Sequence, residues 1–200
     1  MIWGGILATP FLNFTMEIKI LTTNGSPMLN GALKEMHRNS LSGEVVYAVA
    51  HEDSKTSFNL SMQKIMHSTT GVLLLFEDDV EIRDFSHFEE AVSQLPNDWE
   101  LCYLGANLIA PIEKYSENLY KTFGAWTTHA VMYNNPKVLC KGYTDTSIMF
   151  DDWLKTWIHP RGNTYIIKPM IAWQKPHKSD LWDHYADYTR IFDDSANKLI

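Results

Sequence analysis

Two hydrophobic periods alternate along the first half of the chain. Apolar runs that close on turn residues predict strands at residues 16–27, 44–53 and 72–82. Apolar residues spaced three or four positions apart predict helices at residues 28–40, 55–70 and 85–96. The second strand is continuous and rich in β-branched residues, so we expect it to be buried on both faces. Strands that alternate with helices pair in parallel, which predicts a doubly wound sheet.

The pattern changes in the second half of the chain. We expect a strand at residues 99–107, strand segments around Gly124, and a strand pair or one bent strand at 164–175. Helices are expected from Pro136 and across 145–158, and the tail at 179–192 fits an extended loop or a helix. No internal repeat or low-complexity linker is present. The sequence therefore predicts a single α/β domain over residues 1–200, with a central, mostly parallel mixed sheet flanked by helices.

Composition and charge narrow the function. Hydrophobic residues make up 45% of the 200 residues and charged residues 20%, as in an ordinary globular protein. The net charge is −7 and no run of Lys or Arg occurs, so we expect no nucleic-acid partner. An acidic protein that binds an anionic ligand needs a cation between the two.

Cysteine content and the apolar N-terminus bear on location. Cys102 and Cys140 are too few for a disulfide framework, which favours a reducing compartment such as the cytoplasm. The apolar stretch 1–14 has no preceding Lys or Arg, is interrupted by Pro10 and is too short to span a bilayer. We expect a buried first segment and no stable membrane insertion, with a membrane anchor as the alternative.

The most informative stretch is the acidic end of the third strand. Glu77, Asp78 and Asp79 directly follow the apolar run 72–76. Ligands of open α/β sheets sit at the carboxyl ends of the strands. Clustered carboxylates repel one another unless a cation neutralises them, and oxygen ligands select Mg²⁺ or Mn²⁺. The sequence thus predicts a divalent ion that holds phosphates, with a solvated acidic turn as the alternative.

The segment "GVLLLFEDDVEI" resembles the one that carries the acidic motif of GT-A glycosyltransferases. It is similar to that of family 25 lipopolysaccharide-type enzymes and of the glycosyltransferases that chlorella-type viruses use on their capsid protein. "LGAN", "GAWTTHAVMYN" and "DDWL" follow in a similar order, so the resemblance covers roughly residues 16–180. It implies one GT-A-like, Rossmann-like domain, with a nucleotide-sugar-binding half at about 1–98 and an acceptor-binding half at about 99–200.

The resemblance also implies roles for particular residues. The motif places Asp79 as a metal ligand, Glu77 at the ribose or the metal, and Asp78 near the donor. Candidates for contact with the rest of the nucleotide lie in the loop after the first strand, at the end of the second strand and on the helix that follows: Thr22, Thr23, Asn24, His51, Glu52, Asp53, Asn59, Gln63 and Lys64. Ordinary surface hydrogen bonding is the alternative for each of them.

A third metal ligand in many such enzymes is a histidine near the C-terminus. His177 and His184 are available, and His177 stands among Lys175 and Lys178, which suit a diphosphate. An ordinary surface histidine is the alternative.

An inverting transferase needs a carboxylate that takes the proton of the acceptor hydroxyl. Asp151 and Asp152 stand near a predicted helix start, where capping explains one of them. We favour Asp152 as the base because Asp151 is better placed to cap the helix. Trp153 and Trp157 follow as possible sugar platforms.

The resemblance therefore implies a metal-dependent glycosyltransferase. It would use Mn²⁺ or Mg²⁺ to move a sugar from a UDP-sugar to a glycan or glycoprotein acceptor. The Asp151–Asp152 pair favours inversion, with a retaining mechanism as the alternative. The low cysteine count places the protein in the cytoplasm, or in the host cytoplasm if the chain is viral. The alternatives are a metal-dependent phosphohydrolase or nucleotidyltransferase, and a non-catalytic nucleotide- or carbohydrate-binding module.

Overall fold

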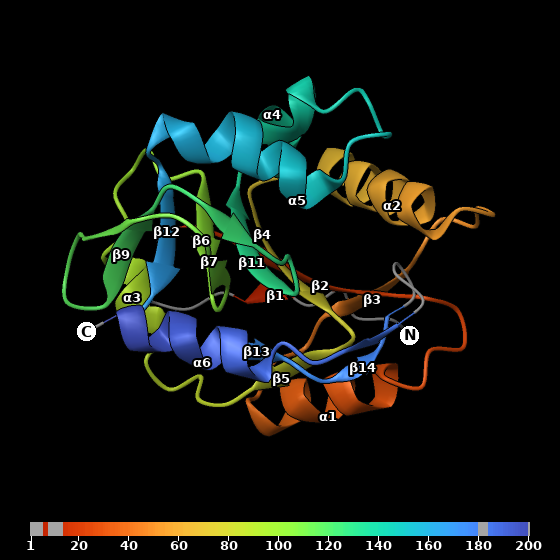
Figure 1. Ribbon diagram of the computed structural model, residues 1–200, viewed down its shortest axis with the longest axis horizontal. Helices are drawn as coiled ribbons and strands as arrows, with labels where there is room; N and C mark the ends of the chain where they lie inside the picture. The colour runs from red at the N-terminus through yellow and green to blue at the C-terminus, as the bar shows by residue number, and fades with distance from the viewer. Residues whose placement is uncertain (1–5, 8–13, 180–183, 200) are drawn as a thin grey trace.

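The chain folds around one large mixed sheet with helices on both faces (Figure 1). The computed structural model describes residues 6–7, 14–179 and 184–199. Its central sheet has the strand order β1-β2-β4-β11-β6-β12-β9-β8, and β3 pairs with β2 beside this path. The strands of this sheet are β1 (Ile6–Leu7), β2 (Met16–Thr22), β3 (Glu44–Tyr47), β4 (Val72–Glu77), β6 (Leu101–Tyr103), β8 (Ile112–Lys114), β9 (Leu119–Thr122), β11 (Ala130–Asn134) and β12 (Thr164–Ile167).

Three small two-stranded sheets flank the central one. They pair β5 (Val80–Ile82) with β13 (Ala172–Gln174), β7 (Asn107–Leu108) with β10 (Ala125–Trp126), and β14 (His177–Lys178) with β15 (Tyr185–Ala186). The segment expected as a strand pair or one bent strand at 164–175 is thus two strands in different sheets.

Helices cover both faces of the central sheet. They are α1 (Leu29–Arg38), α2 (Ser54–Ser68), α3 (Phe88–Ser93), α4 (Pro136–Leu139), α5 (Phe150–Trp153) and α6 (Thr189–Lys198). A 3₁₀ turn at Cys140–Gly142 follows α4, and a π-helical stretch at Leu154–Ile158 and a 3₁₀ turn at His159–Arg161 extend α5. No helix in these described ranges is long and apolar enough to cross a lipid bilayer.

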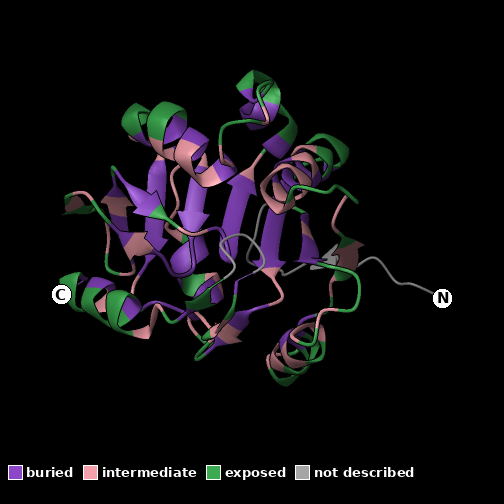
Figure 2. Ribbon diagram, turned by 45° about the vertical axis from the view of Figure 1, so that its right-hand side comes forward, coloured by how far each residue is buried: buried purple, intermediate pink, exposed green. Residues whose placement is uncertain are grey.

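Each face of the sheet has its own hydrophobic core, because successive residues of a strand point to opposite faces. In β4, Leu73 and Leu75 pack with residues of α2, α5 and α6, whereas Leu74 and Phe76 pack with residues of α1 and α3. The inner strands of the central sheet are buried, whereas β3 and β8 and the outer sides of the helices are partly exposed (Figure 2).

The predicted fold class, an α/β domain with a central mixed sheet, is confirmed, but less of the sheet is parallel than predicted. Parallel ladders join β2 to β3, β2 to β4 and β6 to β12, and the other described ladders of this sheet are antiparallel. Strand–helix alternation gave the correct pairing only in the first half. In the second half, among the described strands of this sheet, only β8 and β9 form a hairpin with a short link, whereas β11 pairs with β4 and β6, and β12 with β9, across long stretches of chain that local patterns do not reveal.

The expectation that the second strand is buried on both faces is wrong. In the described part of the chain β3 pairs with β2 alone, and Tyr47 at its end keeps 54% of its surface exposed. β1 occupies the start of the same edge of β2, at Met16 and Glu17. The apolar stretch 1–14 lies mostly outside the described residues.

A close backbone crossing holds β13 against β6. The carbonyl of Leu104 accepts hydrogen bonds from the amides of Ile171 at 2.7 Å and Ala172 at 3.1 Å. A Cβ atom on Gly105 would lie 1.8 Å from the carbonyl oxygen of Ala172. Only glycine permits this approach. The crossing therefore fixes the position of β13, the strand that ends at Gln174.

We expect Gly105→Ala to lower the free energy of unfolding by about 3 kcal/mol or more, because the clash is with backbone that cannot rotate away. Urea unfolding measures the effect. Gly142→Ala is the matched control, since its Cβ would lie 3.7 Å from the nearest Trp153 atom and its cost should stay below about 1 kcal/mol. Equal stabilities of the two variants would contradict the crossing.

Candidate active site

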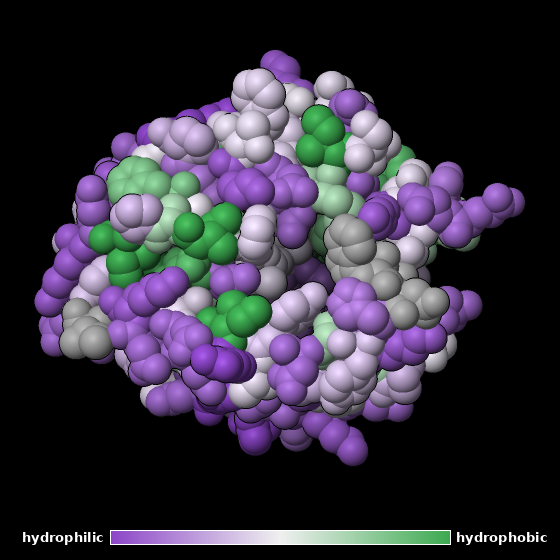
Figure 3. All heavy atoms as spheres, viewed as in Figure 1, coloured by the Kyte–Doolittle hydropathy of each residue, from purple (hydrophilic) through white to green (hydrophobic). Residues whose placement is uncertain are grey.

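The acidic motif lies at the carboxyl end of β4, as predicted. β4 ends at Glu77, whose amide donates to the carbonyl of His129 at 2.9 Å, and Asp78 and Asp79 form the tight turn to β5. β2 and β3 run parallel to β4, so their carboxyl ends reach the same edge of the sheet. The face of the molecule seen in Figure 1 is hollowed near its centre, where hydrophilic atoms line the depression (Figure 3).

Each of the three carboxylates accepts a hydrogen bond from a different segment. Thr22 at the end of β2 donates its hydroxyl to Asp78 Oδ2 at 2.5 Å. The Thr128 hydroxyl donates to Glu77 Oε1 at 2.7 Å. Gln174 at the end of β13 donates Nε2 to Asp79 Oδ2 at 2.6 Å. Three segments far apart in sequence therefore converge on one turn.

Sequence reasoning identified Thr22 but missed Thr128 and Gln174. Neither belongs to a motif with a recognisable spacing, and each reaches the site because its strand runs antiparallel to a strand next to the motif. The pairing of β11 with β4 brings Thr128 beside Glu77. The pairing of β13 with β5 places Gln174 opposite Val80, next to Asp79.

Burial makes the ionised form of this cluster costly. Burial, the Asp79 charge and, more weakly, the Asp78 and Asp151 charges raise the pKa of Glu77 to about 8, although the hydrogen bond from Thr128 opposes the shift. Burial also raises the pKa of Asp79 to about 6, against the hydrogen bond from Gln174 and the attraction of His177. Asp79 is only 4% exposed, and its Oδ1 has no hydrogen-bond partner among the described residues.

His177 completes the surroundings of Asp79. Its Nδ1 lies 2.9 Å from the carbonyl oxygen of Lys175, and because a carbonyl only accepts, Nδ1 carries the proton. In the neutral ring Nε2 then presents a lone pair, 3.5 Å from Asp79 Oδ2. Two acceptors that face each other need a proton or a cation between them. The amide of Lys175 donates to the carbonyl of Asp79 at 2.7 Å, which fixes this segment to the acidic turn.

These residues fit a hard divalent cation. Asp79 supplies a buried oxygen without a partner, His177 an imidazole nitrogen held by its other nitrogen, and Glu77 a second carboxylate. Among the described residues, no group of three or more His, Cys, Asp or Glu side chains is placed so that it could hold a metal ion by itself. Mg²⁺ and similar ions often take only one or two protein carboxylates and complete their shell with phosphates and water, so a preformed cage is not required.

The residues predicted to contact the nucleotide divide into two groups. Thr22 is buried against Asp78, and Thr23 and Asn24 are exposed in the turn after β2. Glu52 and Lys64 are exposed. All five remain predictions as nucleotide contacts.

The remaining predicted nucleotide contacts have structural partners. Asp53 caps α2, where its carboxylate accepts from the amide and hydroxyl of Thr56, and these bonds lower its pKa. His51 Nδ1 accepts from the amide of Asp53 at 3.0 Å. These contacts hold the loop between β3 and α2.

Asn59 is corrected from a diphosphate candidate to a structural residue, and Gln63 has a structural partner but remains a prediction. Asn59 is 1% exposed, donates to the carbonyls of Thr146 and Ile148, and accepts from the amide of Phe150 at 3.1 Å. Gln63 donates to the carbonyl of Tyr143 at 3.1 Å. Both amides therefore tie α2 to the segment that leads into α5, and Asn59 holds the residue directly before Asp151.

The structure separates Asp151 from Asp152. Asp151 is partly buried, its Oδ1 accepts from the amide of Asp152 at 2.8 Å, and burial together with the Asp152 charge raises its pKa. Its charge contributes to the raised pKa of Glu77, so it lies on the side of the acidic cluster. The Asp152 side chain is 50% exposed and lies 2.8 Å from Lys155 Nζ. The helix begins after Met149, so the expected capping role of Asp151 is wrong.

Trp153 is corrected from a sugar platform to a core residue. It is 5% exposed and packs against Tyr143 and Phe150. Trp157 is 59% exposed.

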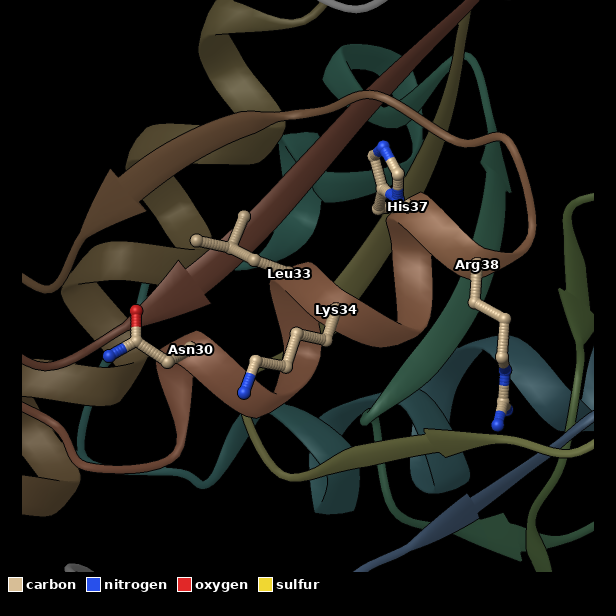
Figure 4. Close-up of a pocket in the computed structure, with 5 residues that line it drawn as sticks. All are labelled: Asn30, Leu33, Lys34, His37 and Arg38. Atoms are coloured by element: carbon tan, nitrogen blue, oxygen red, sulfur yellow. The ribbon is translucent and has the colours of Figure 1, made fainter.

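A second depression lies on α1, apart from the acidic cluster (Figure 4). All the residues that line it come from this one helix: Asn30, Leu33, Lys34, His37 and Arg38. It contains none of the predicted site residues.

No protein-family model matches the chain, and no curated protein does. Among solved structures, A197 from STIV is similar, with a TM-score of 0.54 at 11% identity over 80% of this chain and 84% of that one. This likeness shows a shared fold.

Two further likenesses are more distant and carry no argument. A glycosyltransferase involved in the glycosylation of the major capsid of PBCV-1 has a TM-score of 0.44 at 10% identity, over 76% of this chain and 81% of that one. Mannose-1-phosphate geranyltransferase from Thermus thermophilus has a TM-score of 0.42 at 8% identity, over 75% and 72%. Membership of family 25 stays a prediction.

The raised pKa of Glu77 predicts that the metal-free protein loses stability as the pH rises. The folded protein holds the Glu77 proton up to about pH 8, whereas the ordinary pKa is 4.5. Between these values the folded state binds more protons than the unfolded state, so the free energy of unfolding falls with rising pH. Burial lowers the pKa of His129 and His159 to about 4 from the ordinary value of 6.5. These histidines make the free energy of unfolding rise with pH, but only below about pH 6.5, outside the range tested. We expect a decrease of at most about 2 kcal/mol from pH 6.5 to 8.5 in urea unfolding.

The control for this prediction is Glu77→Gln, which removes the titrating group and keeps an oxygen for the Thr128 hydroxyl. Its free energy of unfolding should stay level over the same range. Mn²⁺ binds the ionised carboxylates and should flatten the wild-type slope. Parallel wild-type and variant curves would contradict the raised pKa.

Proposed function

We propose that the protein is a metal-dependent glycosyltransferase of the GT-A type, which transfers a sugar from a nucleotide-sugar donor to a glycan or glycoprotein acceptor. One observation carries the proposal. The buried Asp79 carboxylate has an oxygen without a partner and faces His177 at the carboxyl end of a strand with parallel neighbours. A divalent cation at this position, Mn²⁺ or Mg²⁺, would be held by Asp79, His177 and Glu77 and would stabilise negative charge on a leaving diphosphate.

The donor lies at the carboxyl ends of β2, β3 and β4 in this proposal. Thr22 is bonded to Asp78 and orients it toward the donor, and Thr23, Asn24 and Glu52 line the same edge from the loops after β2 and β3. Exposed Lys64 on α2 stays a diphosphate candidate. We favour a UDP-sugar.

Asp151 is the general base in this proposal, in place of Asp152. Asp151 is partly buried, its charge acts on Glu77, and a raised pKa suits a group that accepts a proton near neutral pH. Asp152 is half exposed and its carboxylate is engaged by the Lys155 ammonium at 2.8 Å. In the reaction the acceptor hydroxyl gives its proton to Asp151 and its oxygen bonds to the anomeric carbon. The bond between that carbon and the diphosphate oxygen breaks, and the configuration inverts.

The two halves of the chain divide the work in this proposal. Residues 1–98 supply the donor edge, and residues 99–200 supply Asp151 and the acceptor side. Cys102 and Cys140 are free and buried, which supports a reducing compartment. We place the protein in the cytoplasm, or in the host cytoplasm if the chain is viral.

Donor binding tests the proposal first. We expect UDP, but not GDP or CMP, to raise the melting temperature, and only when Mn²⁺ is present. Asp79→Asn keeps an oxygen for Gln174 but removes the charge, so the calorimetric affinity for UDP with Mn²⁺ should fall at least about 100-fold.

Asp84→Asn is the matched control, because Asp84 is an exposed carboxylate five residues further along the chain. Its affinity for UDP should equal that of the wild type. Metal-independent UDP binding, or unchanged binding by the Asp79 variant, would refute the metal site. Release of free sugar or of nucleotide products with no transfer to any acceptor would favour a phosphohydrolase or nucleotidyltransferase instead.

The base assignment predicts opposite results for two neighbouring variants. Asp151→Asn still accepts the Asp152 amide but cannot take a proton, so kcat should fall about 10²- to 10⁴-fold with little change in donor affinity. Asp152→Asn should retain most of the activity. The reverse ranking would restore Asp152 as the base, and normal turnover by both would point to a retaining mechanism, which NMR of the product anomer would reveal.

A further inference from the structure

An exposed tryptophan lies beside the acidic cluster. Trp126 ends β10 and keeps 38% of its surface exposed, although β10 is paired with β7. A large aromatic ring that stays exposed next to a polar site is more informative than a single apolar residue elsewhere on the surface.

A lysine that follows α5 lies over this ring, and an aspartate of α5 pairs with that lysine. Lys155 Nζ lies 4.7 Å from the centre of the Trp126 ring and 2.8 Å from Asp152 Oδ1. The cation–π contact and the ion pair restrict both side chains. We call Trp126, Lys155 and Asp152 the Trp126 platform.

The platform is joined to the acidic cluster at both ends. Trp126 stands two residues before Thr128, whose hydroxyl is bonded to Glu77. Thr127 between them has a φ of 79°, a strained value for a β-branched residue. Asp152 directly follows Asp151, whose charge acts on Glu77. The platform therefore borders the site on the side that carries the candidate base.

The chemistry of the platform matches a sugar ring. A pyranose has an apolar face of C–H groups, which packs on an indole ring, and a rim of hydroxyls, which bond to a carboxylate and an ammonium. The donor nucleotide belongs at the opposite side of the site, at the ends of β2 and β3. We propose that the Trp126 platform binds a pyranose ring of the glycan acceptor; the acceptor role, though not pyranose binding itself, rests on the proposed function.

Saturation-transfer NMR titration with a panel of methyl pyranosides, the α and β forms of glucoside, galactoside and mannoside, tests the proposal. At least one should bind the wild-type protein through its ring C–H protons. Trp126→Ala should weaken that binding about tenfold, and Trp126→Phe should recover part of the loss. The same variants should bind UDP with Mn²⁺ as the wild type does.

Trp157→Ala is the comparison variant, because the sequence suggested Trp157 as a sugar platform and the proposal assigns that role to Trp126 instead. Trp157 is more exposed than Trp126 and lies in the helical stretch that carries Lys155. Residues two positions apart on a helix do not face the same way, so Trp157 points away from Lys155. Its pyranoside binding should be unchanged.

Each result decides one of the two proposals. No pyranoside binding by the wild type, unchanged binding by Trp126→Ala, or equal losses in Trp126→Ala and Trp157→Ala would overturn the platform. Pyranoside binding that depends on Trp126 in a protein that fails to bind UDP would uphold the platform and overturn the glycosyltransferase. Loss of UDP binding in Trp126→Ala would place the ring at the donor and overturn the acceptor assignment.

Discussion

Repulsion and desolvation among the carboxylates of Glu77, Asp78 and Asp79 are the constraint around which this site is built. A strand that ends in three acids, two of them with pKa values raised to about 8 and about 6, is costly to fold unless the surroundings offset the charge. Hydrogen bonds from Thr22, Thr128 and Gln174 offset part of it, one to each acid. The charge on the Asp79 oxygen that has no hydrogen-bond partner is not offset by these bonds.

Antiparallel pairing in the second half of the chain is what brings those donors together. A wholly parallel sheet would send the residues before β11 to the opposite edge from the end of β4. Because β11 runs against β4, the segment before it lies beside Glu77. β13 runs against β5 in the same way, so its last residue meets Asp79. The close crossing at Gly105 sets where β13 begins.

Local patterns predicted the features that depend on local sequence. The apolar run before Glu77 placed the acids at a strand end, and helical spacing located α1 and α2. Features that depend on distant partners were not predictable. Nothing near Thr128 or Gln174 in the sequence indicates that they donate to the acidic cluster. The Asn59 amide could bind a diphosphate by its chemistry. In the structure it bonds instead to a loop about 90 residues away along the chain. Trp153 and Trp157 look alike in sequence, and only packing shows that one is buried.

An anomalous-scattering map at the manganese edge, from crystals grown with MnCl₂ and UDP, tests the central claim most directly. The account predicts one strong peak within about 2.0–2.4 Å of the Asp79 carboxylate, with His177 Nε2 and the UDP diphosphate as further ligands. Ordered UDP at the ends of β2 and β4 with no manganese at Asp79 would contradict it.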